Sequence, residues 1–187
     1  MAQQQNGYAI VPHDTYDEYR TYCLTHGINV DYTYGNQCWD SCALLWYQYG
    51  LRLETGNGYA YGCWTLRRDQ NAQPPFTMIT NPQEIKRGDV LVFNQHGSWF
   101  TGHIALADED YNGTNNIRTL GQNQGQGTSP GTPSNIINSS LTWFLGAFRN
   151  TNWQVTPPTP PTPPTPTETS EKKFPWVLYA KKLRQRR

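Results

Sequence analysis

A run in which proline alternates with threonine divides this 187-residue chain. It reads TPPTPPTPPTPT and covers residues 156–167. Because proline fixes φ and lacks an N–H donor, such a run cannot join a helix or a sheet, and it favours extended polyproline II. Its reach is roughly 3 Å per residue. The residues that can build a hydrophobic core therefore precede it, and their number suits one domain rather than two.

The rest of the chain divides around this run. We predict an N-terminal lead-in at 1–13, one folded domain at 14–155, a Pro/Thr-rich linker at 156–170 and a C-terminal tail at 171–187. The tail mixes aromatic and basic side chains and is too short to fold alone. This mixture suits an anionic surface, such as lipid headgroups or an anionic wall polymer. A solubilising or assembly peptide is the alternative.

Net charge and composition restrict the possible partners and location of the chain only slightly. The formal net charge of +1 gives no global argument for nucleic acid as a partner, and we expect a monomer. Residues 1–8 lack the apolar core of a signal peptide, and no apolar run is long enough to cross a bilayer.

Helical patterns come first and strand patterns later. We predict helices at 14–26 and from about residue 36 to 49, with Asn36 as the N-cap of the second. Strands are predicted at 88–93, 103–107 and 117–123, and the segment 143–149 is expected to close the sheet. Residues 51–82 are rich in Gly, Asn, Gln and Pro and are assigned little regular structure. This order predicts an α+β fold with an antiparallel sheet.

Cys38 and His103 are the candidates for chemistry. Cys38 falls in the first turn of the second helix, where backbone N–H groups and the helix dipole favour a thiolate. His103 begins a strand, so a rigid element can hold its ring, and we prefer it to the loop residue His96 as general base. A packed thiol is the alternative for Cys38. Cys42 lies one turn deeper, on an apolar stripe, and is expected in the core.

Four sequence segments resemble the CHAP family of cysteine- and histidine-dependent amidohydrolases and peptidases, common in phage endolysins. They are Gly35-Asn36-Gln37-Cys38-Trp39-Asp40, Gly88-Asp89-Val90-Leu91-Val92-Phe93, Thr101-Gly102-His103-Ile104-Ala105 and Gly121-Gln122-Asn123-Gln124. They occur in the family's order, and the resemblance spans about 14–149. It implies a papain-like α+β fold with helices packed on an antiparallel sheet.

The resemblance also implies a function. The enzyme would cut an amide bond of bacterial peptidoglycan, either as an N-acetylmuramoyl-L-alanine amidase or as an endopeptidase, through a thioester. Cys38 would be the nucleophile, His103 the base and then the acid, and Asn123 the group that orients the imidazole. A phage lysin of this kind would stay in the host cytoplasm until a holin or lysis releases it, or travel on the virion.

Gly121 departs from the family pattern. The family commonly carries Glu two positions before the asparagine, and this chain has Gly121 there. Either Asn123 suffices, or Asp108 or Glu109 substitutes from outside the motif, or the site is weakened or inactive. The last case would make the chain a non-catalytic wall-binding or virion structural protein with a degenerate CHAP fold.

A calcium site is a second implication of the resemblance. Some phage CHAP domains bind Ca²⁺ in the loop before the nucleophile helix. The matching positions here are Asn29, Asp31, Thr33, Gly35 and Asp40, where Thr33 and Gly35 would contribute carbonyls. Alternating oxygen ligands suit Ca²⁺. The alternative is a turn held by Asx side-chain bonds, with Asp40 favouring the helix start. No organic cofactor is expected.

Two further sets of residues remain open in the sequence. The loop aromatics Trp64, Trp99 and Phe100 either flank the cleft, where rings suit sugar faces, or pack in the core or its rim. Cys23 and Cys63 are either packed thiols or a disulfide.

Overall fold

The structure is a computed structural model, and it describes residues 3–5, 8–10, 13–125 and 132–153. The chain divides into two units, Met1–Val155 and Thr156–Arg187, and the second lies outside the described residues. The predicted linker and C-terminal tail fall there and stay predictions. None of the helices in the described ranges is long and apolar enough to cross a lipid bilayer.

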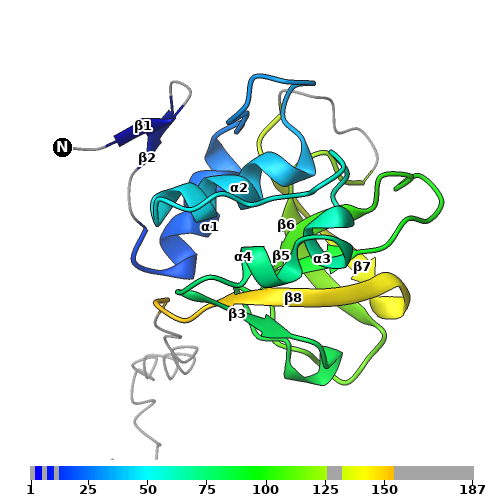
Figure 1. The fold of residues 1–187 in the computed structure, drawn as a ribbon. Coiled ribbons are helices and arrows are strands. Elements are labelled where there is room, and N and C mark those ends of the chain that lie inside the picture. The colour runs from blue at the N-terminus through cyan, green and yellow to red at the C-terminus, as the bar shows by residue number, and fades with distance from the viewer. Residues whose placement is uncertain (1–2, 6–7, 11–12, 126–131, 154–187) are drawn as a thin grey trace, which may run out of the picture. The chain divides into compact units, whose positions relative to one another are not determined.

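The elements follow the predicted order, with helices before most of the sheet (Figure 1). A short hairpin, β1 (Gln3–Gln5) and β2 (Tyr8–Ile10), precedes α1 (Tyr16–Thr25), α2 (Cys38–Gln48), α3 (Gly62–Thr65) and α4 (Arg68–Asn71). The strands β3 (Phe76–Ile79), β4 (Val90–Phe93), β5 (His103–Ala107), β6 (Asn116–Gly121), β7 (Asn135–Ser140) and β8 (Phe144–Asn150) follow. Two 3-10 turns, at Pro82–Glu84 and Leu141–Trp143, lie between strands. The α+β fold class is confirmed.

The main sheet has six antiparallel strands in the order β3-β8-β4-β5-β6-β7. The last strand, β8, therefore lies inside the sheet, between β3 and β4, and Figure 1 shows it running below α3 and α4. His103 pairs with Phe93 at one end of the β4–β5 ladder. This register places His103 at an end of the sheet, where a loop and a helix terminus can reach it.

The two faces of the sheet bury different cores, because strand side chains alternate. Val90 and Val92 of β4 face a large core shared with α1 and α2. Leu91 and Phe93 face a smaller core on the other side. Trp46 of α2 is fully buried in the large core. Figure 1 shows α1 and α2 packed together on one side of the sheet. This packing fixes α2, and with it Cys38, against the strands.

Several elements differ from the prediction. Helices α3 and α4 and strand β3 lie in the segment 51–82, which we expected to be irregular, and β7 was missed as well. Asn71 explains why the short helices form there: its side-chain amide donates to the carbonyls of Glu54 and Cys63 and accepts the Glu54 N–H. A buried side chain thus holds this segment together, and local propensity does not reveal it.

Candidate active site

Cys38 is the first residue of α2, at the start of the helix that packs on the sheet. The N-cap is Gln37 and not Asn36 as predicted. Asp40 stabilises this start, since its carboxylate accepts the N–H of Gln37 at 2.7 Å and the N–H of Val30 at 2.9 Å. Two fixed backbone segments therefore meet at Asp40. The result is a helix terminus held rigidly with the thiol in its first turn.

Opposing effects act on the Cys38 thiol. Burial is the larger, and it raises the pKa of Cys38 to about 11. The N–H groups of Ile104, Trp39 and Cys38 itself point at the sulfur and lower the pKa, against that effect. Ile104 directly follows His103, so the thiol lies against the start of β5. At rest Cys38 is a neutral thiol surrounded by donors that would bind its anion.

His103 is almost fully buried at the start of β5, with 1% of its surface exposed. The ring of Trp99 stacks on it, with centroids 4.2 Å apart and an interplanar angle of 20°. Burial lowers the pKa of His103 to about 4, while a hydrogen bond from its side chain to Gln124 raises it and His96 lowers it. The imidazole is therefore neutral at physiological pH, as a general base must be.

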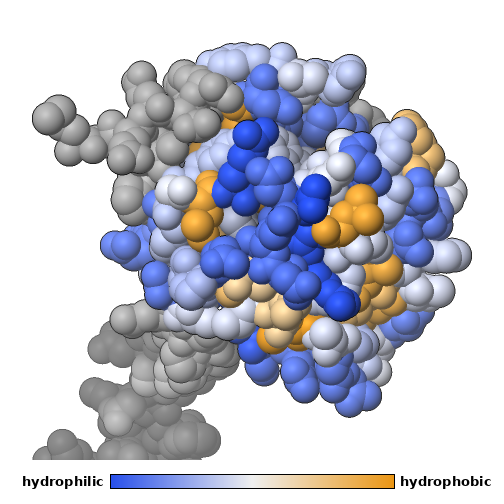
Figure 2. Space-filling model, in the orientation of Figure 1, coloured by the Kyte–Doolittle hydropathy of each residue, from blue (hydrophilic) through white to orange (hydrophobic). Residues whose placement is uncertain are grey.

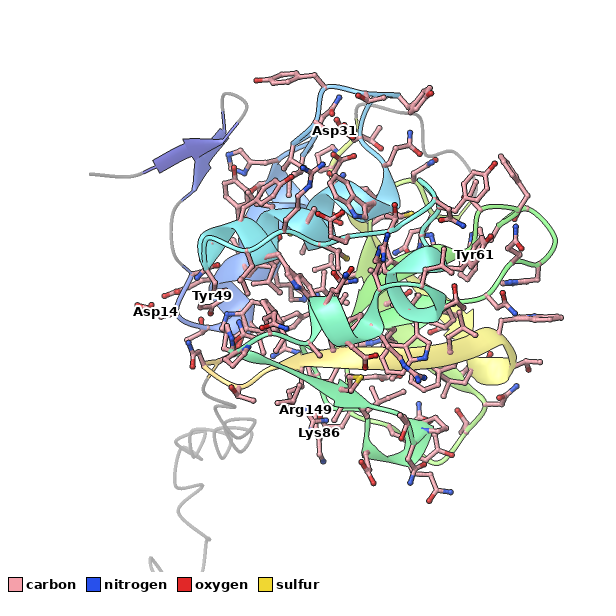
Figure 3. The ribbon with its side chains drawn as sticks, viewed as in Figure 1. Asp14, Asp31, Tyr49, Tyr61, Lys86 and Arg149 are labelled. Carbon is pink, nitrogen blue, oxygen red and sulfur yellow. The ribbon has the colours of Figure 1, made fainter. Side chains whose placement is uncertain are left out.

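Gly102 directs the chain into β5. It has φ of +71°, in the left-handed region, and a Cβ there would lie 2.7 Å from the carbonyl oxygen of Phe93. The neighbouring Thr101 carbonyl accepts the N–H of Tyr61 at 3.3 Å, which joins this loop to the start of α3. Figure 3 labels Tyr61 beside α3. Only glycine fits this approach, and it delivers His103 to a fixed place.

Cys38, His103 and Asn123 line one cleft of about 1350 Å³. Aromatic side chains line it too: Tyr34, Trp39, Tyr59, Trp99 and Phe100. Tyr34 and Phe100 are 84% and 75% exposed, so their rings are open to a ligand. The face shown in Figure 2 is mostly hydrophilic, with apolar residues in small separate patches. A cleft with polar groups and open aromatic rings suits a ligand that combines sugar and peptide.

Two of the three predicted loop aromatics are at this cleft. Trp99 and Phe100 line it, whereas Trp64 is buried and packs against Phe148. A Cβ on Gly146 would lie 2.1 Å from the Trp64 ring, so the indole lies flat on β8. His96, which we ranked below His103, also lines the cleft and stacks on Trp143.

The structure does not bring Asn123 to His103. Asn123 follows the end of β6 with φ of +49°, and its amide donates to Gln37 Oε1 at 2.8 Å. The next residue, Gln124, turns inward instead, and its Oε1 lies 2.9 Å from His103 Nε2. The positive φ of Asn123 separates the two directions. The sequence analysis did not identify Gln124 as a partner of His103. The feature that could have indicated it is an amide side chain three residues after Gly121, the position where an acidic residue was expected.

The acidic substitutes for the missing carboxylate are elsewhere. Asp108 follows the far end of β5, roughly 16 Å along the strand from His103, and binds Arg20 at 2.6 Å and Tyr16 at 2.9 Å. Glu109 pairs with Arg118. Both acids are therefore committed to structural contacts and do not support the imidazole.

The other cysteines are free thiols. Cys23, Cys42 and Cys63 are fully buried, which confirms Cys42 as a core residue and answers the open question about Cys23 and Cys63. Burial raises the pKa of each. Cys38 alone among the four lines the cleft described above.

The predicted calcium loop holds two acids near each other. Asp31 lies on the loop before α2, as labelled in Figure 3, and its Oδ1 accepts the Thr33 N–H at 2.8 Å. Burial raises the pKa of Asp40 to about 6, and the negative charge of Asp31 adds to the rise. Within the described residues no three His, Cys, Asp or Glu side chains converge as a metal site would require. Any cation here would therefore depend on backbone carbonyls.

The fold and this site define a class: an α+β protein with a thiol at a helix N-terminus and an imidazole at a strand start, in one cleft. The CHAP domain model matches residues 27–123, which is 97 of the 187 residues. The chain belongs to the CHAP domain family. The matched range contains Cys38, His103 and Asn123, and it ends one residue before Gln124.

Two relatives extend the comparison. The chain is 32% identical over 114 residues to a D-alanyl-L-alanine endopeptidase of Streptococcus phage B30, a match that covers 59% of this chain and 25% of that protein. The chain thus spans about a quarter of that relative. The crystal structure of the endolysin LysIME-EF1 superposes with a TM-score of 0.61 at 22% identity, over 76% of this chain and 67% of that one. It shares the fold.

Proposed function

We propose that this protein is a cysteine-dependent peptidoglycan hydrolase of the phage lysin type, acting at the bacterial cell wall. One observation carries the proposal: Cys38 and His103 line a single cleft, on elements that pack in the core. Membership of the CHAP family and the similarity to a phage endopeptidase support the same reaction class. Both support a cut at an amide bond of the wall.

The chemistry follows from the two side chains. His103 takes the thiol proton as the Cys38 sulfur attacks the carbonyl carbon of the amide. The N–H groups at the start of α2 lie where they can stabilise the resulting oxyanion. The imidazolium then gives its proton to the leaving amine, and a thioester remains on Cys38. Water, deprotonated by His103, hydrolyses the thioester and releases the acid.

We test this with purified peptidoglycan and mass spectrometry of released fragments. Wild type is compared with Cys38→Ala and with Cys42→Ala, a matched change of a buried thiol on the same helix. Wild type and Cys42→Ala should release new amines, and Cys38→Ala should release none. The fragment masses then name the bond. Equal release by Cys38→Ala would refute the thioester mechanism, and wall binding without release by wild type would favour the non-catalytic alternative.

Calcium belongs to the same proposal. Asp31 in the loop before α2 lies near Asp40 in the first turn of that helix, and the Asp40 carboxylate, which accepts the N–H groups of Gln37, Val30 and Asp31, keeps lone-pair capacity for a cation. Bound Ca²⁺ would offset their repulsion and hold the start of the nucleophile helix. Thermal unfolding in Ca²⁺ and in EDTA tests this: a higher midpoint in Ca²⁺ that Asp31→Asn removes supports the site, and equal midpoints refute it.

A further inference from the structure

The side chain of Gln124 is fixed by three partners. It is buried, with 1% of its surface exposed. Its Nε2 donates to the carbonyl oxygens of Thr119 at 3.0 Å and Asn135 at 2.9 Å. Because both amide hydrogens are used in this way, the atom that faces His103 is the oxygen. Oε1 can only accept a hydrogen bond.

This orientation determines the tautomer of His103. The distance from Gln124 Oε1 to His103 Nε2 is 2.9 Å, so Nε2 carries the hydrogen and donates it. In the neutral ring the other nitrogen, Nδ1, then has a free lone pair. Nδ1 is thereby prepared to accept the proton of Cys38. The amide does this without a charge.

Gly121 provides the space that Gln124 occupies. A Cβ at position 121 would lie 3.0 Å from Gln124 Oε1, 3.2 Å from its Cδ and 3.0 Å from Ala105 Cβ. Gly121 is the last residue of β6 and does not have a positive φ, so its backbone does not require glycine. Glycine is needed at position 121 because a larger residue would occupy the space of the Gln124 side chain. The same position would carry the carboxylate that the family resemblance leads one to expect.

We propose that Gln124 is the positioning residue of His103, and that Gly121 is its structural complement. The pair replaces the expected acidic residue with a neutral amide that enters from three residues further along the chain. The role in catalysis rests on the proposed function, whereas the control of the tautomer does not. A neutral partner supports the orientation of the ring and gives no charge to stabilise the imidazolium, so burial, the largest effect, lowers the pKa of His103 although the hydrogen bond to Gln124 raises it.

The first experiment reads the tautomer directly and needs no activity. Nitrogen NMR on ¹⁵N-histidine protein should show His103 as the Nε2–H form in wild type. Gln124→Ala should release the ring into a mixture of tautomers. The matched control is Gln122→Ala, since Gln122 is an equally buried amide that bonds to the backbone of Ile28 and Gln37 and does not touch His103. The control should keep the Nε2–H form.

A double-mutant cycle tests whether Gly121 acts by leaving room for the Gln124 side chain. Gly121→Ala adds one methyl group that displaces the Gln124 amide, so it should disturb the His103 tautomer and lower kcat about tenfold or more. In the Gln124→Ala background the same methyl group has free space on the Gln124 side and meets only Ala105 Cβ, so Gly121→Ala should then change both quantities much less than in wild type. In the Gln122→Ala background its full effect should persist. The KM for peptidoglycan should hold throughout, because Gln124 acts through His103.

The outcomes separate the two proposals. Persistence of the Nε2–H form in Gln124→Ala, or additive effects of Gly121→Ala and Gln124→Ala, would overturn the positioning role while leaving the hydrolase assignment intact. A wild type that shows the Nε2–H form, loses it in Gln124→Ala and yet releases no fragments would overturn the proposed function alone.

Discussion

The ionisation of Cys38 yields a quantitative prediction about its reactivity. At neutral pH both side chains are uncharged, because burial raises the pKa of Cys38 to about 11 and lowers that of His103 to about 4. With a pKa of about 11, the thiolate fraction at pH 7 is ~10⁻⁴, against ~3% for an ordinary thiol of pKa about 8.5. The fraction grows about tenfold per pH unit up to about pH 10.

The assay is the rate of iodoacetamide alkylation at Cys38 between pH 5 and 10, followed by peptide mass spectrometry, with Cys38→Ala as the background. We expect the rate to rise about tenfold per pH unit from pH 7 to 10, because the thiolate is the reacting species. No plateau should appear near neutrality. A rate that is flat from pH 6 to 8, with a midpoint below about pH 5, would show a preformed thiolate–imidazolium pair and refute this reasoning.

Two further predictions concern stability. Gly146→Ala places a methyl group into the Trp64 ring, so urea unfolding should show a loss of roughly 1–3 kcal/mol, and an unchanged midpoint would contradict the packing. Asp108→Ala removes the acceptor of Arg20 and Tyr16 and should cost roughly 2–3 kcal/mol, discounted because Arg20 is partly exposed. Burial raises the pKa of Asp108, but the bonds from Arg20 and Tyr16 outweigh it and lower the net value, so its contribution is present above about pH 4 and is lost as pH falls through the folded pKa. An acid unfolding midpoint that Asp108→Ala leaves unmoved would contradict this pairing.

Strong local patterns made much of the fold predictable. The strand at 103–107 has the predicted bounds, and helix α2 begins within two residues of the expected start. Buried apolar runs and a glycine before each strand gave a clear signal there. Cys38 and His103 followed from the same patterns, because a helix start and a strand start are positions that sequence marks well.

The missed parts depend on distant contacts. Strand β7 is half polar because it forms the edge of the sheet, so it lacks an apolar run. Helices α3 and α4 are single turns, and Asn71 at the end of α4 joins them through bonds to Cys63 of α3 and to Glu54, 17 residues earlier in the chain. Gln124 lies in a polar stretch where Asn123 matched the family pattern better. Only the left-handed backbone of Asn123, which the sequence does not display, turns one amide out and the next one in.

The place of β8 in the sheet has a consequence for synthesis of the protein. Helix α2 is complete at Gln48, but the strand that joins β3 to β4 ends at Asn150. At about 5–20 residues per second on the ribosome, roughly 5–20 s separate the two. From the synthesis of β4 until that of β8, the edges of β3 and β4 that β8 will occupy have no partner strand. Cys38 and His103 are therefore synthesised well before β8 can complete the sheet that holds them in place.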